Sequence, residues 1–209
     1  FIDFSFGLLF MICLIGLSVY TLVFCGWSSN SKYSIFGAYR GVAQTISYEV
    51  SLVLIMLSLV VLVGSFDLLD LSELQENCYF FVLMLPLCMV WFISSLAEVN
   101  RVPFDFAEGE SELVSGFNIE YSGCSFVLIF LAEYSSLLFM SFLFSVLFFG
   151  GSGVFYFVGV LLVLFLFILI RGTLPRFRYD NLMYLAWKSF LPISLAYFMF
   201  FVGVKFMLS

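Results

Sequence analysis

The chain has no histidine among its 209 residues, and its five cysteines are widely spaced, without a CxxC pair. The sequence therefore shows no ligand pattern for zinc, haem or an iron–sulfur cluster. Without histidine, any proton chemistry has to use carboxylates, tyrosines, lysines or water. Only 11% of the residues are charged, with eight Lys and Arg against fourteen Asp and Glu, a net charge of −6. This balance excludes a nucleic-acid-binding face and a basic, lipid-seeking surface helix.

Apolar residues, in contrast, make up 64% of the chain, which includes 30 Phe, 11 Tyr and 3 Trp. The mean hydropathy is +1.17. Soluble domains hold roughly 45–50% apolar and about 25% charged residues. The composition indicates an all-α polytopic membrane protein with a single membrane domain over residues 1–209.

Six apolar segments are long enough to cross a hydrocarbon core of about 30 Å at a rise of about 1.5 Å per residue. The predicted transmembrane spans are about 4–27, 41–66, 77–97, 121–149, 154–170 and 182–207. The uncharged run 134–170 is too long for one crossing, and Gly150-Gly151-Ser152-Gly153 is its predicted break. Pro86 lies inside the third span, where membrane helices tolerate proline.

The basic residues are distributed unequally between the two ends of these spans. Seven of the eight fall on one side, namely Lys32, Arg40, Arg101, Arg171, Arg176, Arg178 and Lys188. The other side has an acidic connection over 67–76 and the glycine-rich turn, and Lys205 can snorkel to that interface. The positive-inside rule then places the basic loops on the inner side of the membrane.

Two carboxyl groups are predicted to lie within the apolar slab, Glu49 in the second span and Glu133 in the fourth. A charge there costs at least about 2.5 kcal/mol, so such acids usually serve a function. A structural ion pair or a position near the headgroups would also explain Glu49. For Glu133 the adjacent hydroxyls of Tyr134, Ser135 and Ser136 could hydrogen-bond the carboxyl group.

The predicted loop 98–120 is acidic although it lies on the basic side. It holds six acids and one Arg, interleaved with Phe and other apolar residues, so we expect it to pack into protein. A solvated loop remains the simple alternative for Glu110 or Glu112 taken alone. Carboxylates crowded in a low dielectric bind protons more tightly, which favours a proton relay, and Arg101 could hold one of them ionised.

The loop 171–181 is basic and aromatic. Topological anchoring explains it adequately. The alternative is docking onto an acidic partner subunit.

Three stretches of the chain resemble one known family. Residues 97–121, AEVNRVPFDFAEGESELVSGFNIEY, are similar to the signature loop of subunit 1 of complex I, the proton-pumping NADH:ubiquinone oxidoreductase. Residues 37–49, GAYRGVAQTISYE, and 175–183, PRFRYDNLM, with Trp187-Lys188 and Leu191-Pro192, resemble the same family. Together these stretches cover the chain from the first span to the last.

The resemblance implies a subunit at the junction of the membrane arm and the peripheral arm, lining the chamber through which ubiquinone reaches its reduction site. It assigns Arg40, Arg101, Phe104, Asp105 and Glu108 to the quinone chamber or its loop. It assigns Glu49, Glu98, Glu108, Glu112 and Glu133 to an acidic proton path toward the pumping subunits. Arg176, Arg178 and Asp180 would contact peripheral-arm partners.

The same resemblance implies that the chain binds no flavin, haem, iron–sulfur cluster or metal, and that other subunits handle NADH. Family members begin with a further membrane helix, a surface helix and another span. We therefore expect those residues either to precede Phe1 in a longer protein or to be supplied by another chain.

Two other interpretations remain open at this stage. One is the homologous membrane subunit of a hydrogenase-type complex, and the other is a stand-alone proton or cation transporter that uses Glu49 and Glu133. The Phe excess and the missing histidine suggest nucleotide bias in an organellar gene. They favour the mitochondrial inner membrane, with basic loops facing the matrix, over a bacterial plasma membrane.

Overall fold

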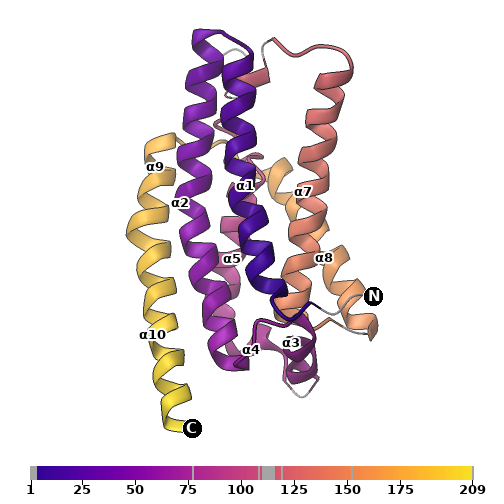
Figure 1. Ribbon diagram of the computed structural model, residues 1–209, viewed down its shortest axis with the longest axis vertical. Coiled ribbons are helices and arrows are strands. Elements are labelled where there is room, and N and C mark those ends of the chain that lie inside the picture. The colour runs from indigo at the N-terminus through magenta and orange to yellow at the C-terminus, as the bar shows by residue number, and fades with distance from the viewer. Residues whose placement is uncertain are drawn as a thin grey trace.

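The computed structural model describes residues 4–76, 78–107, 109, 116–118, 120–151 and 153–208. The regular elements within them are all helices and none is a strand, which confirms the predicted all-α class (Figure 1). The elements are α1 Gly7–Ser28, α2 Lys32–Val63, α3 Leu68–Gln75, α4 Phe80–Leu83, α5 Leu85–Glu98, the short 3-10 helix η1 Gly116–Asn118, α7 Cys124–Phe149, α8 Gly153–Thr173, α9 Tyr179–Tyr184, the π-helix η2 Leu185–Phe190 and α10 Leu191–Leu208.

Five helical stretches of the described chain are long and apolar enough to cross a membrane: α1, α2, α7, α8 and the continuous run 179–207. The segment predicted as the third span is instead divided into α4 and α5 at Met84, whose φ and ψ are −123° and 38°. Pro86 lies in the first turn of α5. Because proline has no N–H and its ring clashes with the carbonyl four residues earlier, it favours a helix start there.

Helix α2 is the central element of the bundle and packs against α1, α5, α10 and η1. It begins at Lys32 rather than at Gly41, and the Ser31 side chain caps it by accepting a 3.2 Å bond from the Ser34 N–H. With 32 residues it is about 48 Å long at 1.5 Å per residue. It therefore extends beyond a hydrocarbon core of about 30 Å.

The end of α2 opposite the basic loops is closed by Gly64, which adopts a left-handed conformation with φ of 92°. Lys205 of α10 donates a 3.1 Å bond to the Leu62 carbonyl beside it. The lysine on the acidic side thus satisfies a carbonyl at a helix C-terminus, where positive charge is favourable.

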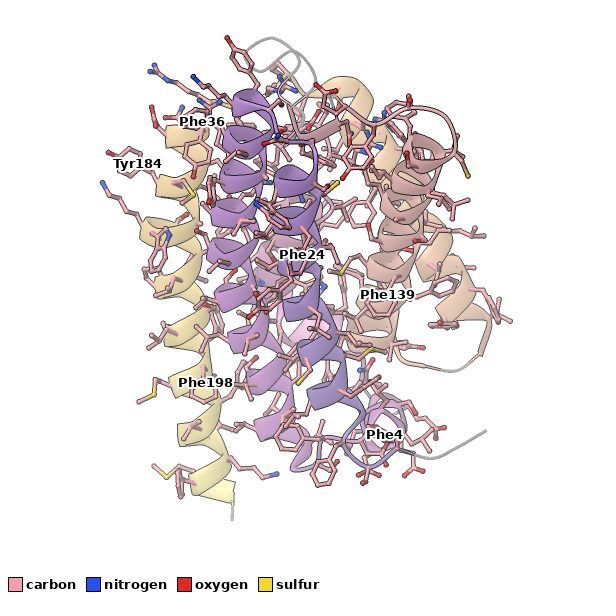
Figure 2. The ribbon with its side chains drawn as sticks, turned by 45° about the horizontal axis from the view of Figure 1, so that its top comes forward. Phe4, Phe24, Phe36, Phe139, Tyr184 and Phe198 are labelled. Carbon is pink, nitrogen blue, oxygen red and sulfur yellow. The ribbon has the colours of Figure 1, made fainter. Side chains whose placement is uncertain are left out.

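Much of the outer surface is apolar and aromatic. Phe24 of α1 and Phe36 of α2 are more than 60% exposed, and both project from the bundle in Figure 2. The core lies between α2, α5 and α7, where Tyr48, Trp91 and Phe148 are fully buried. Apolar surface of this extent on every side is typical of a protein solvated by lipid.

Candidate functional site

Three glutamates from three helices carry the acidic character of the bundle interior. Glu98 ends α5, and its Oε1 accepts a 3.4 Å bond from Ser18 of α1. Its Oε2 is shielded from solvent and has no hydrogen-bond partner among the described residues. Glu49 of α2 is close enough to Glu98 for their charges to interact. A Cβ added to Gly16 of α1 would stand 3.0 Å from Oε1 of Glu49, so the carboxyl group occupies space that this glycine leaves open.

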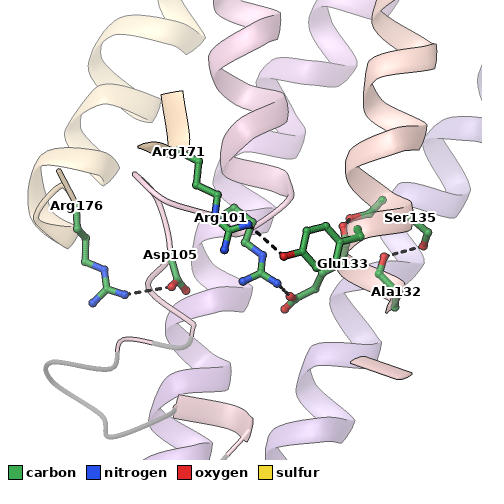
Figure 3. A network of polar contacts seen from close by, with 9 residues as sticks. Arg101, Asp105, Ala132, Glu133, Ser135, Arg171 and Arg176 are labelled. Atoms are coloured by element: carbon green, nitrogen blue, oxygen red, sulfur yellow. Dashed lines mark hydrogen bonds and ion pairs between the residues drawn. The ribbon is translucent and has the colours of Figure 1, made fainter. Parts of the chain in front are cut away.

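Glu133 of α7 forms an ion pair with Arg101 of the loop, and the side chains are only 17% and 8% exposed. The Arg101 guanidinium, drawn against Glu133 in Figure 3, also lies 5.1 Å from the ring centroid of Phe130 and 5.4 Å from that of Tyr134. One carboxylate that Arg101 pairs with thus comes from helix α7. Aromatic faces and a carboxylate together stabilise a guanidinium in this apolar setting.

The hydroxyl groups beside Glu133 bond differently from the prediction. Ser135 donates to the Ala132 carbonyl at 2.7 Å, and Ser136 donates to the backbone carbonyl of Glu133 at 2.8 Å. The Tyr134 hydroxyl accepts a 3.2 Å bond from Arg171. The serine hydroxyls bond within the helix because the carbonyl three residues earlier lies within their reach.

A cavity of about 670 Å³ lies between α1 and α7, with Glu98 and Glu133 both in its wall. Hydroxyl-bearing side chains line it beside many apolar ones; they are Ser18, Thr21, Thr45, Ser135 and Ser136. A cavity with hydroxyls and two carboxyl groups can hold water, and water lowers the cost of charge at this depth. The arrangement can therefore take up, hold and release protons.

Phe104 and Asp105, assigned by resemblance to the quinone chamber, are buried where the loop meets the basic segment, and they line neither this cavity nor a smaller one beside Arg171. Asp105 accepts a 3.1 Å bond from Arg176. Phe104 packs against Phe177, with ring centroids 5.6 Å apart, and against Tyr48. The structure thus joins a residue predicted for docking, Arg176, to one predicted for the chamber.

The other predicted residues near this face do not line the cavity of Glu98 and Glu133. Arg40 is partly buried on α2 and interacts electrostatically with Tyr179. Arg178 and Asp180 are exposed and pair with each other at 3.3 Å. Glu108 and Glu112 lie outside the described residues, as does Glu110.

Gln44 is a site residue to which the sequence analysis assigned no role. It is fully buried on α2, and its Nε2 donates 2.8 Å bonds to the carbonyls of Ala97 and Phe104. One amide thereby holds both the end of α5 and the start of the loop. In the sequence, the signal that could have pointed to Gln44 is a polar residue within an apolar helix. That signal does not reveal which carbonyl groups the amide would reach.

The loop also packs directly onto the backbone of α2. A Cβ added to Gly37 would stand 2.9 Å from the Ala107 carbonyl oxygen and 3.1 Å from the Phe117 nitrogen. One turn along, a Cβ at Gly41 would stand 3.1 Å from Cβ of Ala107. At Gly37 a side chain would collide with backbone atoms of the loop, and at Gly41 the Ala107 methyl group would have to shift by a few tenths of an ångström. The described parts of the loop therefore pack closely on these two glycines.

The described residues contain no group of His, Cys, Asp and Glu side chains that could hold a metal ion. Fold and site together define a polytopic helical membrane protein whose interior carries a carboxyl pair, a buried arginine–glutamate ion pair and a cavity between them. A family described as NADH dehydrogenase matches residues 1–202, and the chain belongs to that family.

Several similar proteins are named NADH-ubiquinone oxidoreductase chain 1. The one from Aedes aegypti is 60% identical over 205 residues, 97% of this chain and 66% of the relative. The one from Locusta migratoria is 60% identical over 207 residues, 98% and 66% of the two chains. The one from Notamacropus eugenii is 49% identical over 217 aligned residues, covering 100% of this chain and 68% of the relative. The chain thus spans about two thirds of the length of these relatives.

Proposed function

We propose that this chain is a core membrane subunit of a proton-translocating NADH:ubiquinone oxidoreductase. In this role it lines part of the ubiquinone chamber at the junction with the peripheral arm and couples quinone reduction to proton movement. The observation that carries the proposal is that Glu98 and Glu133, from two helices of an apolar bundle, line one cavity, and that Glu49 of a third helix is close enough to Glu98 for their charges to interact. Carboxyl groups inside a membrane are costly and are usually part of an ion or proton path.

The chain's own contribution is electrostatic and conformational. Reducing a quinone takes up two protons and changes the charge nearby. Glu98, whose Oε2 has no hydrogen-bond partner among the described residues, would respond by changing its protonation. Glu133, held by Arg101, would respond through that ion pair. The electron carriers and the NADH site would belong to other subunits, and membrane lipids would surround the apolar exterior.

The proposal places the chain in the mitochondrial inner membrane, with the basic loops facing the matrix. Arg40, Arg101, Phe104, Asp105 and Glu108 would face the quinone chamber or shape its loop, and Glu108 and Glu112 would extend the proton path. Arg178 and Asp180 are exposed on the basic segment and are available to partner subunits. Arg176 would act mainly inside the chain, through Asp105.

The proposed proton path is tested by Glu133→Gln in the assembled complex. The amide keeps the shape of the side chain but carries neither charge nor titratable proton. NADH:quinone activity should therefore fall by about a hundredfold or more, the lower end of the effect of removing a proton-transfer group. NADH oxidation by a water-soluble acceptor should stay unchanged.

Glu73→Gln is the matched control, because Glu73 is exposed on α3 at the opposite end of the bundle. Equal loss of both activities in Glu133→Gln would indicate failed assembly. Full quinone activity would exclude Glu133 from coupling. Proton movement without any NADH or quinone dependence would instead favour a transporter, and hydrogen-linked activity would favour a hydrogenase-type complex.

The quinone-chamber assignment is tested by Asp105→Asn. Removing the charge opposite Arg176 should loosen the loop at Phe104 and shift the concentration of a quinone-site inhibitor that halves turnover by about fivefold, equivalent to about 1 kcal/mol. Asp180→Asn removes a similar charge from an exposed pair and should leave this concentration unchanged. Wild-type inhibition together with wild-type turnover in Asp105→Asn would remove this residue from the chamber.

A further inference from the structure

A second, smaller cavity of about 300 Å³ lies on the other side of Arg101, between α7 and α8. Its long walls are apolar, with Leu137 and Leu138 on α7 and Leu164 and Ile168 on α8. Leu164, Ile168 and Arg171 share one face of α8, since they are spaced four and three residues apart. The slot runs along that face for seven residues, about 10 Å.

Positive charge gathers at one end of this slot. Arg101 and Arg171 both line it, and Figure 3 shows the two side chains next to each other. The Arg101 charge is balanced by Glu133. Arg171 donates to the neutral hydroxyl of Tyr134, and within the described ranges no carboxylate lies at ion-pair distance from it. The charge left uncompensated at the mouth of the slot is therefore that of Arg171.

The slot also opens to the outside of the bundle, because Ile168 is 65% exposed and Leu138 is 46% exposed. Arg171 lies in the last turn of α8, at the basic end of the bundle where headgroups would lie. A basic group at the headgroup level, followed by an apolar groove between two membrane helices, has the form of a lipid site.

We propose that this slot binds an anionic phospholipid. The phosphate would accept hydrogen bonds from Arg171, which can offer two parallel N–H groups, and one acyl chain would lie along Leu138, Leu164 and Ile168. A zwitterionic lipid would bind more weakly because its own cation would face Arg171. The site is separate from the cavity of Glu98 and does not depend on the proposed function.

The test uses the assembled complex reconstituted in phosphatidylcholine nanodiscs. Phosphatidylglycerol or phosphatidylcholine with the same photoreactive acyl chain is added, and crosslinked residues are mapped by mass spectrometry. We expect Leu138, Leu164 and Ile168 to be labelled about fivefold more by the phosphatidylglycerol probe, the preference that one basic residue near a membrane surface provides.

Arg171→Gln should abolish this preference, and Arg171→Lys should keep part of it. Arg178→Gln is the control, because Arg178 is exposed on the same face and pairs with Asp180. Equal labelling by the two probes, unchanged preference in Arg171→Gln, or absence of label from these residues would each overturn the proposal. If Arg171→Gln does not assemble, the two probes on the wild-type complex decide.

Discussion

Glu98 and Glu133 line the same cavity, but only Glu133 has a positively charged partner among the described residues. Glu133 has the guanidinium of Arg101 against its carboxylate. Glu98 has a 3.4 Å bond from Ser18 and a shielded Oε2 without a partner in the described part of the chain. A paired carboxylate is costly to disturb, whereas an unpaired one is easily replaced by a neutral group of the same shape.

This difference predicts opposite outcomes for two neutral substitutions. Arg101→Gln removes the guanidinium opposite Glu133 and should destabilise the protein by about 3–5 kcal/mol, the usual effect of breaking a buried ion pair. Glu98→Gln should leave stability nearly unchanged. The measurement is the amount of assembled complex on a native gel and its melting temperature.

A double substitution separates the pair from other effects of Arg101. Arg101→Gln with Glu133→Gln should recover part of the lost stability, because the buried charge of Glu133 is then removed together with the guanidinium opposite it. Loss of assembly in Glu98→Gln, or a normal melting temperature in Arg101→Gln, would contradict this account.

The loop that follows α5 is held by neighbouring elements on two sides. Helix α2 contributes Gln44 and the two glycines under Ala107. The segment before α9 contributes Arg176, the ring of Phe177 and a 3.1 Å bond from the Phe177 N–H to the Pro103 carbonyl. The described part of the loop is therefore an ordered connection, and movement of either neighbour would reach Phe104 and Asp105.

Gln44→Ala should loosen this connection. The carbonyls of Ala97 and Phe104 would each lose a donor, at about 1–3 kcal/mol per unsatisfied group. Amide hydrogen exchange of residues 104–107 in the assembled complex should become faster. Gln75→Ala is the control, because that buried amide donates to the Leu147 carbonyl at the opposite end, so it should cost similar stability without changing exchange at 104–107. Equal exchange in the two variants would refute the role of Gln44.

Composition and apolar run length were sufficient for the fold class, because a hydrocarbon environment allows few architectures and an uncharged run of this kind has to be helical. They did not reveal that α2 extends to Lys32, since its first turns are stabilised by the loop resting on Gly37. They also did not reveal the break at Met84. The first feature depends on a contact between distant segments, and the second coincides with Pro86 in the first turn of α5.

The candidate site was predictable as a set of residue types but not as a set of contacts. The free-energy cost of a charge within the membrane was enough to single out Glu49 and Glu133, because ionisable residues in apolar segments usually serve a function. The partner of Glu133 could not be read from the sequence, since Arg101 is 32 residues away. The same holds for Asp105 and Arg176, 71 residues apart. Tertiary packing decides which opposite charges meet.

The two ends of the bundle differ in charge. Each end carries an exposed native cysteine, whose labelling can test the orientation of the bundle in the membrane. Cys78 is exposed just before α4, and Cys124 is exposed at the start of α7, at the opposite end. With basic loops toward the matrix, a membrane-impermeant thiol reagent should label Cys78 in mitoplasts and Cys124 only in inverted membranes. Cys88, which is buried, is the internal control. The reverse pattern would invert the proposed orientation.

The close packing of the loop on Gly37 also restricts which amino acids this position can hold. Every amino acid other than glycine carries a Cβ, and a Cβ here would stand 2.9 Å from a backbone oxygen, which cannot rotate out of the way as a flexible side chain could. No missense change of this codon is conservative. A substitution at position 37 is therefore expected only together with a change in the backbone of the loop that packs on it.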